Sequence, residues 1–264
     1  MHKIALGIEY DGTRYSGWQR QTHSASIQQH LEQALGFVAD HPVELVCAGR
    51  TDAQVHACLQ VAHFATTAER APRSWMLGAN CRLPRDIRVL WVDAVDDRFH
   101  ARFSAVLRAY RYLILNDPRP SALFHNRVCW QHQELDHDMM QRAAQALVGE
   151  HDFSAFRASG CQSKSPVRRV ESIEVGRHGT LISIDIKANA FLHHMVRNIA
   201  GSLIALGRGE YPVGWLGDVL AGRDRRKAGV TAPAAGLYFV RPYYPDHFGI
   251  LSESRLPVLF EDQA

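Results

Sequence analysis

The sequence has no long apolar run, no cysteine pair and no strong excess of charge of either sign. It contains no apolar stretch long enough to cross a bilayer, and a strand-like pattern follows Met1 directly in place of a signal peptide. We therefore expect a cytoplasmic protein without a membrane segment. The five cysteines are scattered and form no Cys-x-x-Cys motif. This spacing predicts reduced thiols rather than a disulfide framework or a zinc site.

The charge and composition are those of an ordinary globular protein. The net charge of +3 falls short of the basic excess that by itself indicates a nucleic-acid-binding domain. Apolar residues make up 46% of the chain and charged residues 22%, both common values. A chain of 264 residues can form one large domain or two small ones, and this one has no low-complexity linker.

Hydrophobic periodicity divides the first 105 residues into a regular series of strands and helices. Alternating or continuous apolar residues predict strands, and apolar residues three or four apart predict helices. The order is strand, helix, strand, strand, helix, strand, which is that of a ferredoxin-like unit. The predicted strands are residues 4–10, 43–47, 59–65 and 87–95, and the predicted helices are residues 27–38 and 74–81.

The rest of the chain repeats this order, with one additional short helix. A change of pattern at residues 101–106 marks the boundary. We predict an α+β protein of two tandem ferredoxin-like βαββαβ halves, residues 1–105 and 106–264, with antiparallel sheets docked around a central shared cleft. The predicted strands of the second half are residues 108–115, 170–177, 181–188 and 237–241, and its helices are residues 137–148, 191–206 and 213–221.

A polar segment, residues 48–57 (AGRTDAQVHA), follows the buried strand predicted at residues 43–47. Loops at the rim of a sheet commonly carry binding and catalytic side chains. Arg50 lies two residues before Asp52, and a guanidinium near a carboxylate favours the ionised acid. The alternative is a solvated turn in which Thr51 and Asp52 hydrogen-bond their own backbone.

The loop at residues 13–21 (TRYSGWQRQ) mixes aromatic, arginine and amide side chains. Such a mixture suits stacking on bases and contact with phosphates. A loop pinned in place by one buried tryptophan, Trp18, fits the same residues equally well. The composition leaves both interpretations open.

Two polar residues interrupt apolar elements of the second half. Tyr110 lies in a predicted strand and Arg197 in the helix predicted at residues 191–206. Each has a structural alternative: a half-buried strand tyrosine, and a helix arginine whose charged end reaches solvent. His193 and His194 suggest a metal site, but neighbours on a helix point about 100° apart and no third ligand has suitable spacing. We therefore predict no metal site.

Several motifs, spread in order over nearly the whole chain, resemble the tRNA pseudouridine synthase A family, which acts on the anticodon stem-loop of tRNA. The most specific are the Gly-Arg-Thr-Asp run at residues 49–52 and the Phe-Leu-His-His-Met-Val-Arg run at residues 191–197. The matching segments are residues 10–12, 17–21, 48–56, 99–105, 108–112, 152–153, 156–157, 191–201 and 231–237.

The resemblance implies an isomerase that converts uridines 38, 39 and 40 of tRNA to pseudouridine, with Asp52 as the catalytic nucleophile. It implies that Arg197 pairs with Asp52 and that Arg50 binds the displaced nucleotide. Tyr110 would pack against the target base, and Leu237 would form part of the pocket floor.

The resemblance further implies tRNA as the substrate and a homodimer in which one tRNA spans both subunits. Because the reaction oxidises nothing and loses no group, we expect no cofactor and no metal. The target base must leave its stack to reach an enzymatic carboxylate. Arginines that face the cleft would bind phosphates and fix the register of the RNA. The candidates are Arg14, Arg20, Arg102, Arg108, Arg111, Arg168 and Arg169.

One residue departs from the family pattern. The family usually has glycine after the Asp-Ala pair, and this chain has Gln54. If the backbone there requires a positive φ, glutamine costs roughly 1 kcal/mol or more relative to glycine. The departure concerns the shape of the loop and removes no catalytic group.

Two other functions compete with the synthase. A non-catalytic RNA-binding module is compatible with ferredoxin-like halves, but it leaves Asp52 without a role because a carboxylate repels phosphates. A glycoside hydrolase commonly needs two carboxylates flanking the bond, and Asp52 is the only acid in the matched segments near the motif. The synthase accounts for more of the residues than either alternative.

Overall fold

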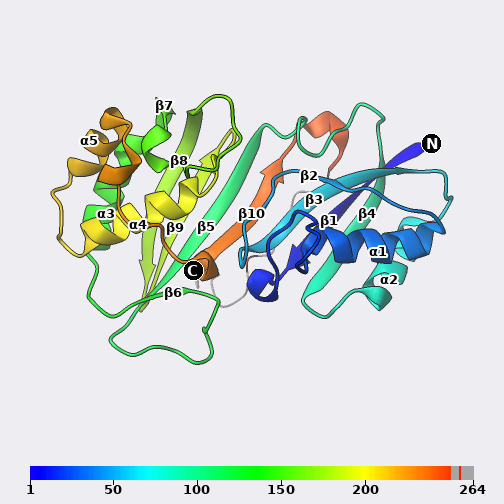
Figure 1. The fold of residues 1–264 in the computed structure, drawn as a ribbon, viewed down its shortest axis with the longest axis horizontal. Coiled ribbons are helices and arrows are strands. Elements are labelled where there is room, and N and C mark those ends of the chain that lie inside the picture. The colour runs from blue at the N-terminus through cyan, green and yellow to red at the C-terminus, as the bar shows by residue number, and fades with distance from the viewer. Residues whose placement is uncertain (251–255, 257–264) are drawn as a thin grey trace. The chain divides into compact units, whose positions relative to one another are not determined.

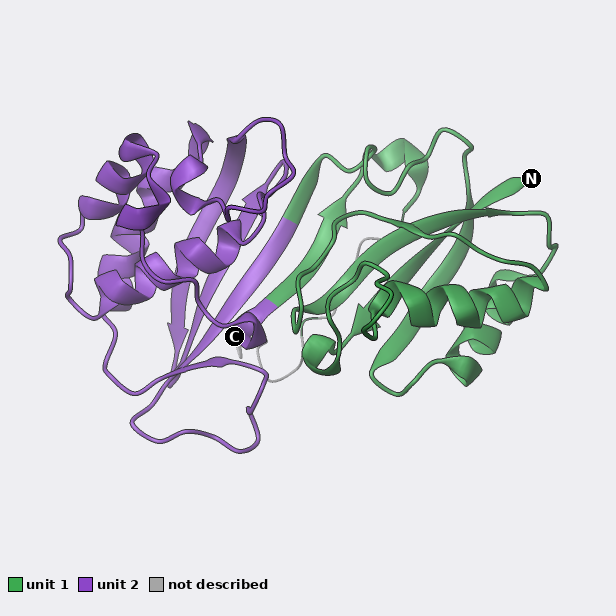
Figure 2. Cartoon of the chain, viewed as in Figure 1, with its two compact units in different colours: residues 1–108, 238–264 green, residues 109–237 purple. Residues whose placement is uncertain are grey.

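In the computed structural model, which describes residues 1–250 and residue 256, the chain forms two compact units (Figure 2). Unit 1 comprises Met1–Arg108 and the chain from Tyr238 onward, and unit 2 comprises Ala109–Leu237. The sequence placed the boundary at residues 105/106 and assigned everything after it to the second half. The last strand belongs to unit 1 instead, because Tyr238 and Phe239 pair with residues of the first half.

Unit 1 consists of a sheet with two helices, labelled in Figure 1. The strand order is β4-β1-β3-β10, with the short β2 also paired to β3. The neighbours β1, β3 and β4 are antiparallel, while β10 runs parallel to β3. The elements are β1 (His2–Tyr10), α1 (Ile27–Ala39), β2 (Val46–Cys47), β3 (His56–Thr66), α2 (Pro72–Arg82), β4 (Ile87–Val95) and β10 (Leu237–Tyr243).

The predicted order of strands and helices in residues 4–95 is confirmed, and β4 has the predicted bounds. Helix α1 begins at Ile27, as predicted, and the Ser26 hydroxyl caps it by accepting a hydrogen bond from the Gln29 N–H at 3.4 Å. The strand predicted at residues 43–47 is shorter than expected, with only Val46–Cys47 in the sheet.

The sheet of unit 1 is covered on both faces. On one face Phe64 of β3 meets Trp75 of α2 edge to face, with ring centroids 5.3 Å apart. A separate buried cluster contains residues of β1 and β3 together with Phe99 and Ala101 from the turn after β4. Because both faces are covered, β3 is buried along nearly its whole length.

Unit 2 contains a further set of sheet strands and three helices (Figure 1). Its strand order is β5-β9-β8-β7, with β6 parallel to β5. The hairpin of β8 and β9 turns at Gly179, whose φ of +60° is readily adopted by glycine. The elements are β5 (Leu107–Asn116), β6 (Cys129–Gln131), α3 (His137–Ala144), β7 (Gly149–Asp152), β8 (Val167–His178), β9 (Leu181–Ala188), α4 (Met195–Gly207) and α5 (Trp215–Gly222).

The secondary structure of unit 2 follows the predicted order but adds two strands that the sequence did not reveal. Strands β6 and β7 have three and four residues, too few to produce a readable alternation.

The structure also has six short 3₁₀ turns in the described residues. These turns are Gly12–Arg14, Gln145–Leu147, Ser154–Phe156, Arg225–Lys227, Ala234–Gly236 and Asp246–Phe248.

Helix α4 begins four residues later than predicted. His194 has a φ of +60°, so helical geometry starts only at Met195 and residues 191–194 lie outside the helix. Leu192, directly before this point, is buried and Phe191 is partly buried, so in the sequence these apolar residues look like a continuation of the apolar face of the helix.

All five cysteines are free thiols, as their spacing predicts. Among the described residues, each helix is too short or too polar to cross a bilayer.

His63 of β3 is a buried histidine whose ring supports the turn after β4. Its Nδ1 accepts a hydrogen bond from the Ala101 N–H at 3.1 Å, and its ring lies 4.8 Å from that of His100. Burial is the main cause that lowers the pKa of His63 from 6.5 to about 4. The native protein therefore holds this imidazole neutral at pH values where the unfolded chain protonates it.

We predict that the free energy of unfolding decreases as the pH falls from 6.5 to 4, because the unfolded state then binds a proton that native His63 does not. His63→Asn keeps an acceptor for the Ala101 N–H and removes the titration, so it should flatten this dependence. Urea unfolding at pH values between 4 and 7.5 measures both proteins. Equal pH dependence in the two proteins would contradict the assignment.

Candidate functional site

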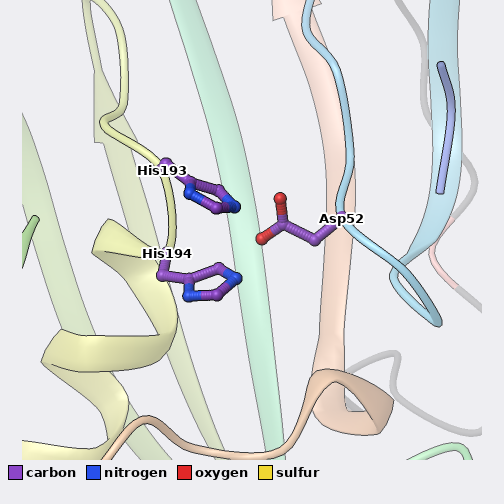
Figure 3. A group of neighbouring side chains, drawn as sticks. All are labelled: Asp52, His193 and His194. Atoms are coloured by element: carbon purple, nitrogen blue, oxygen red, sulfur yellow. The ribbon is translucent and has the colours of Figure 1, made fainter. Parts of the chain in front are cut away.

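Asp52 lies in the loop of residues 48–55, which connects β2 to β3 (Figure 3). The loop leaves the sheet in a fixed direction, because the Ala48 N–H donates to the Val61 carbonyl at 2.8 Å. The Gln60 side chain donates to the Gly49 carbonyl at 2.6 Å. Both bonds come from β3, so the strand that follows the loop also holds its first residues.

Thr51, directly before Asp52, is the most firmly held residue of the loop. Its hydroxyl shares a 2.7 Å hydrogen bond with the Tyr10 hydroxyl, and its carbonyl accepts from the Trp18 N–H at 3.0 Å. Tyr10 and Thr51 are both buried. Burial raises the pKa of Tyr10 well above its ordinary value, so this phenol stays protonated throughout the neutral range. The backbone that carries Asp52 is therefore set by buried hydrogen bonds.

Two glycines allow the segment before α1 to approach this loop. Gly17 has a φ of +93°, and a Cβ there would lie only 2.6 Å from the Thr51 carbonyl oxygen. A Cβ on Gly12 would lie 2.0 Å from the Val55 carbonyl oxygen. Any side chain at either position would force the two segments apart.

The aromatic residues of the loop at residues 13–21 are buried. Trp18 is 1% exposed and packs near Tyr10, with ring centroids 6.1 Å apart. Tyr15 is 5% exposed, and its hydroxyl donates to Asp86 at 2.6 Å. The interpretation of these rings as base-stacking surfaces is therefore wrong. The pinned-loop interpretation is confirmed, and the function of Trp18 is to hold the segment that contacts Thr51.

His56 closes the far end of the loop from within the sheet. Its Nδ1 lies 3.1 Å from a carboxylate oxygen of Asp11 and also 3.1 Å from the backbone nitrogen of Gly12. The imidazole also stacks on Tyr238 of β10, with ring centroids 4.7 Å apart. Burial alone would raise the pKa of Asp11, but hydrogen bonds from His56 and Thr13 lower it below its ordinary value. The histidine of the motif is thus a structural anchor.

Asp52 and Arg50 occupy the polar side of the loop. Asp52 is partly buried, Arg50 is exposed, and the Asp52 carbonyl accepts from the Val55 N–H at 3.2 Å to form a tight turn. Gln54, in this turn, has a φ of +66° and donates its N–H to the Tyr15 carbonyl at 3.1 Å. The condition for strain at Gln54 is therefore met.

The site residues of the second half lie on different elements of unit 2. Tyr110 is on β5, 9% exposed, and meets Phe191 edge to face with ring centroids 4.9 Å apart. Leu237, 5% exposed, begins β10 directly after a 3₁₀ turn. Phe191 thus fixes the orientation of the tyrosine ring from the loop before α4.

Arg197 lies in the first turn of α4, where a positive charge opposes the helix dipole. Its Nε donates to the Ala232 carbonyl at 2.8 Å, and its own carbonyl accepts from the Ala232 N–H at 3.1 Å. This close approach requires glycine at position 201, since a Cβ there would lie 1.8 Å from the Val230 carbonyl oxygen. The segment at residues 230–232 therefore orients the guanidinium, a role that no local sequence pattern indicated.

His193 and His194 precede α4 with their rings side by side, with centroids 4.0 Å apart (Figure 3). The argument that helical spacing separates them by about 100° is wrong, because the backbone at His194 is left-handed and neither residue is in the helix.

The candidate phosphate-binding arginines differ in their surroundings. Arg20 pairs with Glu32 at 3.1 Å, and Arg169 lies 3.6 Å from Glu171. Arg168, near the start of β8, donates to the preceding loop, to the Ser165 carbonyl and the Ser163 hydroxyl. The other pairings are Arg14 with Asp86, Arg111 with Asp185, and Arg108 with backbone carbonyls. Phosphate contact by the paired arginines would compete with these intramolecular partners.

The left-handed residue Gln54 predicts a specific stability effect. Gln54→Gly relieves the strain of the left-handed conformation but also increases the conformational entropy of the unfolded chain. The net effect should be a rise of about 0.5–1 kcal/mol in the free energy of unfolding. Gln54→Val should lower it by about 1 kcal/mol or more, because β-branched residues tolerate this conformation worst. Urea unfolding measures both variants. Ala53→Gly is the control in the same turn and should be destabilising; equal effects of the two glycine substitutions would contradict the strain.

Comparisons with known proteins agree on one family. A family model described as tRNA pseudouridine synthase matches residues 7–104 and 143–245. The tRNA pseudouridine synthase A of Vibrio cholerae is 57% identical over 248 residues, covering 94% of each chain. The enzymes of that name from Hydrogenovibrio crunogenus and Aeromonas hydrophila are each 54% identical, covering 94% and 99% of this chain and 95% and 97% of their own. The chain therefore belongs to the tRNA pseudouridine synthase family.

Proposed function

We propose that this protein isomerises uridines 38, 39 and 40 in the anticodon stem-loop of tRNA to pseudouridine. Relatives named tRNA pseudouridine synthase A match it along nearly their whole length at more than half identity. The observation that carries the proposal is the Gly-Arg-Thr-Asp loop, in which buried hydrogen bonds on Thr51 fix the backbone beside an accessible Asp52.

The reaction breaks the bond between ribose C1′ and uracil N1 and forms a bond between C1′ and C5. The hydrogen on C5 leaves as a proton, and N1 gains one. The atoms and electrons therefore balance without an oxidant, a reductant or a group donor. The enzyme must supply a nucleophile or base, a charge that stabilises it, and a surface that holds the freed uracil.

Asp52 is the proposed nucleophile, because it is the acid of the motif and its backbone is held on both sides. Arg197 is its proposed partner: a guanidinium beside a carboxylate keeps that acid ionised when substrate excludes water. The position of Arg197 in the first turn of a helix supports a functional role, since a cation there opposes the helix dipole. Arg50, which is exposed beside Asp52, is proposed to bind the displaced nucleotide.

The target uridine is proposed to flip out of the RNA stack and to pack against Tyr110, with Leu237 in the pocket floor. Phe191 holds the tyrosine ring in one orientation, which suits a surface that receives a flat base. Arg20, Arg168 and Arg169 are proposed to contact phosphates and position the RNA. The intramolecular partners of Arg20 and Arg169 are carboxylates that phosphate would replace.

The working assembly is proposed to be a cytoplasmic homodimer that binds one tRNA across both subunits and requires no cofactor or metal. The balanced isomerisation supports the absence of a cofactor. The dimer is what the resemblance to the family implies, and the free thiols fit a cytoplasmic location.

Tritium release from tRNA labelled at uridine C5 tests the function, because the C5 hydrogen must leave when the new carbon–carbon bond forms. The native protein should release tritium, and Asp52→Asn should reduce the rate by at least about 10⁴-fold, as expected for loss of a nucleophile. Both proteins should bind tRNA with similar affinity.

Asp40→Asn is the matched control, because Asp40 is exposed in the same unit and its left-handed backbone accepts asparagine. It should release tritium at the native rate. Release by Asp52→Asn at the native rate would remove Asp52 from the mechanism, and no release by the native protein despite tRNA binding would contradict the synthase function.

A further inference from the structure

Phe103 is a large apolar side chain held out into solvent on unit 1, with 77% of the residue exposed. Its ring stacks on that of His100, with centroids 4.3 Å apart and an angle of 30° between the planes. The Arg102 guanidinium lies 5.6 Å from the ring centroid. We call His100, Arg102 and Phe103 the aromatic platform. A single exposed apolar residue is common, so the case for a function depends on how this ring is held.

The turn that carries the platform is rigid. The Nδ1 of His100 accepts hydrogen bonds from the N–H groups of Arg102 and Phe103, both at 3.2 Å. Ser104 closes the turn, accepting from the His100 N–H at 3.0 Å and donating its N–H to the His100 carbonyl at 2.8 Å. Burial lowers the pKa of His100, which keeps Nδ1 available as an acceptor at neutral pH.

The base of the turn is anchored in the core of unit 1. Ala101 donates its N–H to His63 and accepts from the Tyr244 hydroxyl at 2.7 Å. The neighbouring Phe99 is buried, and its carbonyl accepts from the Lys3 ammonium at 2.8 Å. The turn that carries the exposed ring therefore has little conformational freedom. Stacking of a ligand on the ring should cost little conformational entropy of the protein.

Arg108 ties this turn to the loop that carries Asp52. Its guanidinium donates to the Ala48 carbonyl at 3.2 Å, to the Ala105 carbonyl at 2.9 Å and to the Arg102 carbonyl. Ala48 is four residues from Asp52, so their Cα atoms are at most about 15 Å apart. The aromatic platform and the proposed nucleophile thus lie within the reach of a few nucleotides.

The surroundings of the platform carry positive charge. Arg50 and Arg102 both act electrostatically on the Cys47 thiol, whose pKa burial raises to about 12. Two guanidiniums therefore lie near enough to Cys47 to act on it, one on the Asp52 loop and one on the platform. An exposed aromatic ring beside arginines is the combination that binds an unstacked base together with its phosphate.

We propose that the aromatic platform binds a nucleotide of the tRNA that flanks the target uridine. The base stacks on Phe103, and Arg102 contacts the adjacent phosphate. The platform is a positioning surface that holds the stem-loop open next to the flipped uridine and takes no part in the bond changes. This inference rests on the proposed function, since it assumes that tRNA is the substrate.

The test measures the affinity of an unmodified tRNA transcript, and the kcat and KM of tritium release, for Phe103→Ala and Phe103→Trp. Loss of one base stack should raise the Kd and KM of Phe103→Ala between about fivefold and about a hundredfold. The kcat should stay within about twofold, because the lost contact is equal in ground and transition states. Phe103→Trp keeps an aromatic ring at this position and should therefore have the native Kd.

Phe37→Ala is the matched control, since Phe37 is also exposed in unit 1 and also lies against an arginine, Arg82. It should leave the Kd unchanged. Salt titrations distinguish the phosphate contact of the platform from its base stacking. Arg102→Ala should reduce the slope of log K for tRNA binding against log salt concentration by about one, the contribution of one phosphate contact. Phe103→Ala should leave this slope unchanged.

Binding and turnover within twofold of native for Phe103→Ala would overturn the proposal. A change in oligomeric mass of Phe103→Ala, measured by light scattering, would also overturn it and would assign the ring to an interface between copies. Because the Kd is measured without turnover, a native protein that binds tRNA but releases no tritium would contradict the proposed function and leave the test of the platform intact.

Discussion

The geometry of the site depends on the hydrogen bonds of Thr51. Its hydroxyl is hydrogen-bonded to the Tyr10 hydroxyl, and its carbonyl accepts from the Trp18 N–H. One residue thus joins β1, the segment before α1 and the Asp52 loop. Leaving either group buried and unpaired would cost about 1–3 kcal/mol, a penalty that keeps the loop in one conformation. The need for a glycine at position 17 follows from the same constraint, since any Cβ would displace the Thr51 carbonyl.

The loop combines this firm anchoring with local strain. Gln54 takes a left-handed conformation that glycine would adopt at less cost, and the surrounding hydrogen bonds hold it there. Because neutral, buried groups anchor the loop, Arg50 and Asp52 occupy its polar side. In unit 2 the same logic recurs, because the backbone of Ala232 fixes Arg197 and the ring of Phe191 fixes Tyr110.

Much of this arrangement could be predicted from the sequence, and the failures have physical causes. The apolar periodicity of α1 and the apolar alternation of β4 are local signals, and they correctly predict the start of the helix and both ends of the strand. The predicted start of α4 is wrong because the neighbouring sequence does not indicate that the backbone at His194 is left-handed. The composition of the loop could not show whether Trp18 is buried or exposed, since its burial depends on packing near Tyr10 of β1. The anchoring of Arg197 by a segment 35 residues away was likewise invisible.

A pseudouridine synthase rearranges a glycosidic bond in tRNA without hydrolysing it. Nucleoside analysis of an unmodified tRNA transcript before and after incubation with the protein, with assay of the solution for free uracil, tests whether this chain does so. We expect pseudouridine to replace uridine one for one at positions 38 to 40, with unchanged RNA mass and no free uracil. Free uracil in amounts equal to the lost uridine would show hydrolysis and would rule out the synthase function.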